Sequence, residues 1–153
     1  MDYSFGFLGV GGLFVLSFFA ITFSKNKRIR KLCGIPFYYK LVYKDVKKAP
    51  RFSLDINGRY TLVGAPDAIF KHFLLKRYRI VEMKSREIRN GYAKKRELYQ
   101  VTMYIEMVRQ KFGARGQYKG YLAYRNGYKE VSENKGVFKW LTQEKGIDLQ
   151  RCG

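Results

Sequence analysis

Apolar residues run without interruption by charge near the N-terminus, and strand-like and helix-like patterns alternate in the rest of the chain. Residues 5–23 contain no charged side chain and are rich in Phe, Leu, Val and Ile. Coiled as a helix, this run would span about 29 Å, close to the thickness of the hydrocarbon core of a bilayer. We expect residues 1–24 to form a single transmembrane anchor, although a buried core helix or a cleaved signal peptide would give a similar pattern.

Positive charge begins immediately after this run. Lys and Arg side chains crowd residues 25–31, and the positive-inside rule therefore places the C-terminal part of the chain on the cytoplasmic face of an inner or plasma membrane. We expect residues 25–50 to form a basic juxtamembrane segment and a lead-in to the core. Within it, residues 35–46 mix aromatic, β-branched and charged residues, a pattern that fits either a strand or a short helix.

Alternating apolar and polar residues predict strands in the middle of the chain. Residues 52–56 alternate ahead of Asn57-Gly58, a strong hairpin signal, so we expect them to pair antiparallel with residues 59–70. A further strand is expected at residues 78–85, because aromatic and β-branched residues recur there.

A helix and a second hairpin are expected in the C-terminal half. Apolar residues recur every three or four positions over residues 93–112, and Gly113 provides a stop signal. Residues 117–131 read as a hairpin around Asn126-Gly127. Rings and cations interleave along this hairpin and form a candidate nucleic-acid surface, namely Tyr121, Tyr124, Arg125 and Lys129. Half-exposed strands also favour tyrosine for packing, so both interpretations stay open. The tail is expected to add a last packed turn or short helix.

The charge balance of the chain points to an anionic partner. Thirty-one Lys and Arg residues face twelve Asp and Glu residues, which gives a formal net charge of +19. Such a field attracts nucleic acid or an anionic membrane surface, and binding driven by it depends strongly on salt. A basic surface that serves solubility alone is the less favoured alternative.

Cysteine and histidine usage gives little support to metal binding by thiolate or imidazole ligands. Cys33 and Cys152 are far apart in the sequence, so neither a disulfide framework nor a Cys-based zinc site is indicated. His72 is the only histidine, and we interpret it as a surface residue in a turn.

Charged residues interrupt two of the apolar strand patterns. Asp67, Glu82 and Lys84 lie among apolar neighbours, and an unpaired charge in such a strand costs several kcal/mol. Glu82 and Lys84 are two residues apart and would share one face of their strand. We therefore expect the three side chains to contact one another or an ion, with a structural salt bridge as the simpler alternative.

These residues resemble the motifs of the PD-(D/E)XK nuclease superfamily, and in particular its RecB-like branch, which includes the exonucleases of CRISPR adaptation. Residues 64–67 (Gly-Ala-Pro-Asp) resemble the first motif and residues 82–84 (Glu-Met-Lys) the second. Gln100 and Tyr104 resemble the Gln-Tyr helix motif of that branch. The resemblance covers roughly residues 51–131 and implies an α/β fold with a small mixed central sheet flanked by helices, restriction-endonuclease-like, over residues 51–153.

The resemblance also implies roles for the motif residues. A Mg²⁺ or Mn²⁺ ion would be held by the carboxylates of Asp67 and Glu82 and by the main-chain carbonyl of Met83. Lys84 would complete the catalytic set beside the attacking water, and Gln100 and Tyr104 would bind or orient the substrate. Some members also hold an iron–sulfur cluster with four cysteines, which two cysteines cannot supply, so no cluster is expected. Asp45 is the only acid available as an extra ligand in the lead-in, and we expect it to lie outside the site.

The sequence thus predicts a membrane-anchored, metal-dependent deoxyribonuclease. An inactive, membrane-tethered nucleic-acid-binding module is the second interpretation, and a structural subunit of a membrane complex is the third.

Overall fold

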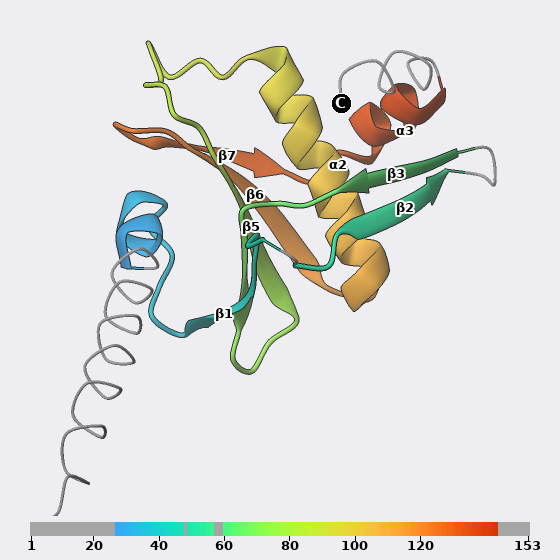
Figure 1. Cartoon of the computed structure of the whole chain (residues 1–153), viewed down its shortest axis with the longest axis horizontal. Helices are drawn as coiled ribbons and strands as arrows, with labels where there is room; N and C mark the ends of the chain where they lie inside the picture. The colour runs from blue at the N-terminus through green and yellow to red at the C-terminus, as the bar shows by residue number, and fades with distance from the viewer. Residues whose placement is uncertain (1–26, 48, 57–59, 144–153) are drawn as a thin grey trace, which may run out of the picture.

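A mixed five-stranded sheet and a separate two-stranded ribbon build the fold, with helices packed against them (Figure 1). The structure, a computed structural model, describes residues 27–47, 49–56 and 60–143. The strands of the large sheet lie in the order β1 (Tyr39–Lys44), β4 (Ala68–His72), β5 (Arg77–Met83), β6 (Gln117–Ala123) and β7 (Tyr128–Ser132). The ribbon pairs β2 (Phe52–Ile56) with β3 (Tyr60–Gly64), and the C-terminal half contributes helices α2 (Lys95–Phe112) and α3 (Lys135–Gln143).

Strand direction explains the place of the long helix. β5 and β6 run parallel, whereas the other neighbours in the large sheet are antiparallel. A parallel pair needs a crossover connection, and α2 provides it between β5 and β6. The expected α/β class, with a mixed sheet flanked by helices, is confirmed.

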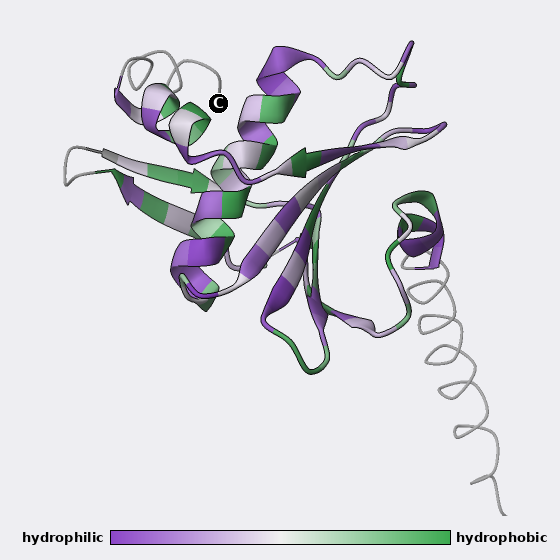
Figure 2. Cartoon of the chain, turned by 180° about the vertical axis from the view of Figure 1, so that it is seen from behind, coloured by the Kyte–Doolittle hydropathy of each residue, from purple (hydrophilic) through white to green (hydrophobic). Residues whose placement is uncertain are grey.

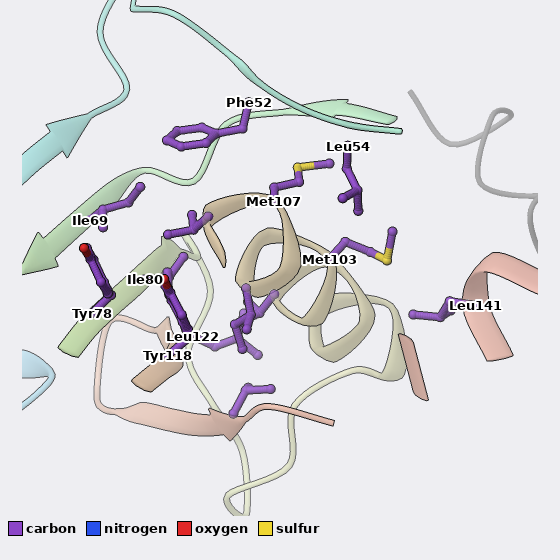
Figure 3. Close-up of a cluster of buried hydrophobic side chains, with 14 of the residues drawn as sticks. Phe52, Leu54, Ile69, Tyr78, Ile80, Met103, Met107, Tyr118, Leu122 and Leu141 are labelled. Carbon is purple, nitrogen blue, oxygen red and sulfur yellow. The ribbon is translucent and has the colours of Figure 1, made fainter. Parts of the chain in front are cut away.

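Alternation along the strands sends side chains into two separate cores. On β5, Tyr78 and Ile80 pack in the core beneath α2, whereas Val81 faces the helical residues 27–32 on the other side of the sheet. Figure 3 shows the larger core, which includes Phe52, Leu54, Ile69, Met103, Met107, Tyr118, Leu122 and Leu141. The smaller core contains Ile29, Cys33, Ile35, Tyr39, Ala68, Phe70, Tyr121 and Ala123. Each fully buried aliphatic side chain stabilises the fold by about 1.5–3 kcal/mol.

A glycine in β6 allows α2 to pack directly on the sheet. A Cβ atom at Gly120 would overlap the side chain of Val101 and would lie 3.2 Å from Ile105 Cδ1. Gln100 and Tyr104 directly precede Val101 and Ile105 along α2. The close approach at Gly120 therefore also sets the distance between these two polar side chains and the sheet.

The first predicted hairpin is confirmed in part. β2 pairs with β3 in antiparallel register, as the Asn-Gly signal predicts. The expectation of one continuous strand over residues 59–70 is wrong, because β3 ends at Gly64 and β4 begins at Ala68 in the other sheet. Pro66, which is fully buried, lacks a main-chain N–H for a strand ladder and restricts the residue before it.

The later elements follow the prediction closely. α2 ends where Gly113 follows it, and β6 and β7 form the second hairpin. Residues 39–44, in the lead-in where strand and helix were both open, form the edge strand β1. The packed unit therefore includes part of the segment that the sequence assigns to residues 25–50.

The predicted anchor at residues 5–23 lies outside the described residues. Within the parts of the chain that the structure describes, none of the helices is long and apolar enough to cross a membrane. The anchor stays a prediction.

Candidate active site

The two acids of the predicted motifs lie opposite each other on neighbouring strands. Ala68 of β4 pairs with Val81 of β5, and extending this antiparallel register by one residue places Asp67 opposite Glu82. Directly opposed residues have Cβ atoms about 4.5–5.5 Å apart, and like charges in such a pair repel. Both acids fall on the face that carries Ile69 and therefore lies against α2.

Main-chain and side-chain hydrogen bonds hold this end of the hairpin together. The N–H of Met83 donates to Asp67 Oδ2 at 2.5 Å, and Lys84 Nζ lies 3.0 Å from Glu82 Oε1. The N–H of Lys84 points the other way and donates to Ala123 O of β6 at 2.7 Å. In an extended strand the N–H and C=O of one residue share a side, so the Met83 carbonyl lies on the side of Asp67.

Helix α2 completes the arrangement. Lys84 Nζ donates to Gln100 Oε1 at 2.8 Å, and Gln100 Nε2 donates to Tyr104 Oη at 3.0 Å. Gln100 and Tyr104 are four residues apart, so they share one helix face. One chain of hydrogen bonds thus runs from Glu82 through Lys84 and Gln100 to Tyr104, with Asp67 beside its first member.

The glycine of the first motif has a packing reason. A Cβ atom at Gly64 would lie 2.8 Å from Tyr104 Cε1 and 3.7 Å from Met107 Cε. Only a residue without a side chain lets the Tyr104 ring lie this close to the end of β3. Gly64 therefore supports the position of the helix residues in the site.

Burial and like charge make Glu82 an unusual carboxyl group. Only 9% of the residue is exposed. Burial, together with the negative charge of Asp67, raises the pKa of Glu82 above its usual range, and the Lys84 ammonium opposes this shift. Burial likewise raises the pKa of Tyr104, and the charges of Glu82 and Asp67 act in the same direction. A cation beside the two carboxylates would relieve this repulsion.

The donor set fits a hard divalent cation. Among residues 27–47, 49–56 and 60–143, no group of three or more His, Cys, Asp and Glu side chains is placed to hold a metal ion. Mg²⁺ is commonly bound by only one or two carboxylates, with waters and substrate phosphate completing its shell. Asp67 and Glu82 could supply those carboxylates, and the Met83 carbonyl, which points toward Asp67, could supply a third oxygen.

Asp45 lies closer to the site than the sequence suggests. Its N–H donates to the main-chain oxygen of Asp67 at 3.0 Å, and its charge contributes to the raised pKa of Tyr104. The side chain is exposed. The pairing of β1 with β4 brings Asp45 to this position, and no local sequence pattern reveals a pairing between strands so far apart in the chain.

His72 takes no part in the site. It ends β4, at the opposite end of the strand from Asp67. Its Nδ1 accepts hydrogen bonds from the N–H groups of Leu74 and Leu75, both at 3.1 Å. The histidine therefore organises the turn between β4 and β5.

The two tyrosines of the candidate nucleic-acid surface are buried, and that part of the prediction is wrong. Tyr121 and Tyr124 are 6% and 1% exposed, so neither ring face is open to a base. Tyr124 donates to Glu97 Oε2 at 2.8 Å and Tyr121 to Glu130 Oε2 at 3.2 Å. The strands use both rings as packing groups with one polar end. Arg125 and Lys129 are exposed, as a nucleic-acid surface requires.

A basic loop next to the site offers a different surface, which the sequence reasoning missed. Residues 84–94 leave the carboxyl end of β5 directly after Glu82 and Met83. Arg89 and Lys94 are exposed there, and the Tyr92 ring is 79% exposed. Cations beside an open ring suit single-stranded or frayed nucleic acid, since the charges contact phosphates and the ring stacks on a base.

Glu97 fixes this loop to the helix and the sheet. It accepts hydrogen bonds from Arg86, from Tyr124 and from the N–H of Lys94. Burial opposes ionisation of Glu97, but these hydrogen bonds outweigh it and lower its pKa to about 2. Asn126 adds a second attachment, because its side chain exchanges two hydrogen bonds with the main chain of Ile88.

No protein-family model, curated protein or solved structure matches this chain. The resemblance to PD-(D/E)XK nucleases therefore stays a prediction. Any chemistry assigned to the site depends on its own residues and their arrangement.

Proposed function

We propose that the protein is a metal-dependent nuclease that hydrolyses phosphodiester bonds, with DNA as the preferred substrate, on the cytoplasmic face of a membrane. The proposal rests on one observation: residues of three motifs, separated by up to 37 positions, contact one another where β4 begins and β5 ends. A simple structural ion pair would need only Glu82 and Lys84, which lie two residues apart at the end of β5. It would give no reason for Asp67 opposite Glu82 or for the Gln100–Tyr104 pair behind Lys84.

The two carboxylates and the Met83 carbonyl are the proposed metal ligands. A Mg²⁺ or Mn²⁺ ion bound there would supply an activated water and stabilise charge on the scissile phosphate. Asp67 and Glu82 each have a second carboxylate oxygen beyond the one that accepts a hydrogen bond from Met83 or Lys84. Their mutual repulsion is already present in the fold, so the site is prepared for positive charge.

Lys84 is the residue best placed to act on the substrate. Its ammonium group has three N–H donors. Within the part of the chain that the structure describes, Glu82 Oε1 and Gln100 Oε1 accept from it. The third donor can orient the attacking water or bind a phosphate oxygen. Gln100 and Tyr104 act on the substrate through Lys84, as positioning residues.

The charge of the chain supports a polyanionic substrate. A net charge of +19 favours phosphate binding, and the exposed cations of residues 84–94 lie next to the proposed metal ligands. The resemblance to the RecB-like branch favours DNA over RNA.

Cleavage assays with the full-length protein in detergent test the proposal. Linear and circular DNA would be incubated with Mg²⁺, with Mn²⁺ or with a chelator. The variants Asp67→Asn, Glu82→Gln and Lys84→Met should each lower the cleavage rate by roughly a hundredfold or more, the usual contribution of one positioned catalytic group. Asp55→Asn, which removes one exposed carboxylate on β2, serves as the matched control and should cleave normally.

Binding measured in chelator separates the competing interpretations. The nuclease proposal requires that the inactive variants still bind DNA with strongly salt-dependent affinity. Equal cleavage by all variants would assign the activity to a contaminant. Wild-type binding without cleavage would instead favour the inactive tethering module, and absence of both would favour a structural subunit of a membrane complex.

A further inference from the structure

Exposed apolar side chains gather at the end of the β4–β5 hairpin that lies opposite the candidate active site. Phe73, Leu74 and Leu75 are 56%, 76% and 44% exposed, and Phe37 and Tyr38 beside them are 89% and 38% exposed. We call these five residues the apolar tip. Figure 2 shows the loop of the hairpin in the colour of hydrophobic residues, projecting from the sheet.

Ring contacts and hydrogen bonds connect the apolar tip to His72. The His72 ring stacks on Phe73 with centroids 5.2 Å apart and contacts Tyr38 at 5.1 Å. Tyr38 in turn contacts Phe37 at 5.5 Å, and its main-chain oxygen accepts a hydrogen bond from the N–H of Phe73 at 3.1 Å. His72 Nδ1 also accepts hydrogen bonds from the N–H groups of Leu74 and Leu75. The main chain of the loop is thus held in place while its apolar side chains are exposed to solvent.

Cations flank the tip on the strands next to it, β1, β4 and β5. Lys40 of β1 pairs in register with Lys71 of β4, and Lys76 and Arg77 follow the loop. Lys40, Lys76 and Arg77 are exposed, and Lys71 is half-buried. The sequence from 27 to 44 and from 68 to 81 contains no Asp or Glu. The charged side chains of these two stretches, which include β1, β4 and most of β5, are therefore all positive.

We propose that the apolar tip inserts into the headgroup region of an anionic lipid bilayer. Leu and Phe side chains enter the boundary between headgroups and acyl chains, a tyrosine ring suits the interface, and the flanking ammonium and guanidinium groups meet lipid phosphates. A projecting loop, with apolar residues at its end and cations along its sides, fits a flat anionic surface. This contact is separate from the predicted anchor at residues 5–23.

Insertion of the tip would set the orientation of the domain. β5 runs from Arg77 beside the tip to Met83 in the site, a span of roughly 20 Å at 3.3 Å per residue. This distance is about twice the Debye length at 0.1 M ionic strength. The candidate active site would therefore face away from the bilayer, beyond most of the influence of the headgroup charges.

Tryptophan fluorescence of the full-length protein in vesicles tests the inference. Trp140 is the only tryptophan, so Trp140→Phe provides a silent background into which Leu74→Trp is introduced. Val63→Trp, at a residue that is 58% exposed on β3, is the matched control. Vesicles would contain phosphatidylcholine and phosphatidylglycerol in equal parts, with brominated acyl chains as the quencher.

We expect the Leu74→Trp emission to shift to shorter wavelength and to be quenched several-fold more than the Val63→Trp emission. Equal quenching at both positions, or none at position 74, would overturn the proposal and leave the tip to a protein partner. Quenching that is as strong in vesicles of phosphatidylcholine alone would refute the requirement for anionic lipid. Replacing Phe73, Leu74 and Leu75 by Ser should leave DNA cleavage in detergent unchanged, so this test fails or succeeds independently of the nuclease proposal.

Discussion

Binding of Mg²⁺ should stabilise the folded protein, because the fold places two carboxylates side by side and a divalent cation would neutralise them. Asp67 lies opposite Glu82 across the β4–β5 pair, and the pKa of Glu82 is raised by its burial and by the charge of Asp67. Lys84 compensates one of the two negative charges. A divalent ion that binds only the folded state therefore shifts the folding equilibrium toward that state.

The size of the effect follows from mass action. At a Mg²⁺ concentration one hundred times Kd, the stabilisation is about 2.7 kcal/mol. For a domain of this size, that free energy corresponds to a rise in Tm of roughly 10 °C. The rise should depend on pH, because Glu82 must lose its proton to bind metal. Because the pKa of Glu82 is raised in the folded state, the protonated carboxyl stabilises the fold at pH values below its ordinary pKa of 4.5. This contribution is lost as the pH rises through the raised pKa, and above that pH the ionised carboxylate would be free to bind metal.

Thermal melts of the full-length protein, followed by circular dichroism with Mg²⁺ or with chelator, measure this effect. We expect a clear rise in Tm at pH 7 and little or none at pH 4. Asp67→Asn should abolish the rise, whereas Asp55→Asn should preserve it. A wild-type Tm that neither Mg²⁺ nor Mn²⁺ changes, or a rise of the same size in Asp67→Asn, would refute the assignment of these carboxylates as metal ligands.

Three further predictions concern the residues that support the site. Gly120→Ala should lower the free energy of unfolding by about 1–3 kcal/mol, because the added methyl group overlaps Val101, and urea titration would detect the loss. An unchanged urea midpoint would mean that α2 does not pack this closely on β6. Glu97 contributes stability that is present above pH 4.5 and lost as the pH falls toward its folded-state pKa of about 2, and Glu97→Gln should remove this contribution. Thermal melts across this pH window should therefore show a flatter pH dependence of stability than wild type. A profile identical to wild type would contradict the hydrogen bonds from Arg86 and Tyr124. Gln100→Ala should lower kcat by roughly tenfold or more with little change in KM, because it removes one hydrogen bond to a charged group. Gln100→Glu should retain part of the rate. An effect confined to KM would instead place Gln100 in substrate binding.

The fold was predictable wherever local patterns decide it. The alternation on either side of each Asn-Gly pair and the helical spacing before Gly113 describe the hydrogen bonding of neighbours along the chain, and the β2–β3 and β6–β7 pairs and α2 lie where they are expected. The partition of strands between two sheets was not predictable in this way. It depends on Pro66, which interrupts the ladder, and on the pairing of β1 with β4 across the intervening ribbon.

The candidate site was predictable for a related reason. Its motif residues lie on elements whose faces follow from periodicity, so Glu82 and Lys84 had to share a side, as did Gln100 and Tyr104. Periodicity does not tell how deeply a side chain is buried. Tyr121 looked like an open ring among cations, but it lies in the core between β6 and the helical residues 27–32. Tyr92 is open because it is in a loop, where no pattern of burial applies.

Charge placement links the two ends of the β4–β5 hairpin. Acidic residues are absent from residues 68–81, and the first one that β5 carries is Glu82, where the strand reaches the candidate site. In a chain with a net charge of +19, two carboxylates thus lie opposite each other at one end of the β4–β5 hairpin, and cations surround apolar side chains at the other end. Both arrangements are costly for an isolated domain, since the first adds repulsion and the second exposes apolar surface to water. A divalent cation would offset the first cost and an anionic bilayer the second, so each end of the hairpin is better explained by a partner of opposite character than by the stability of the domain alone.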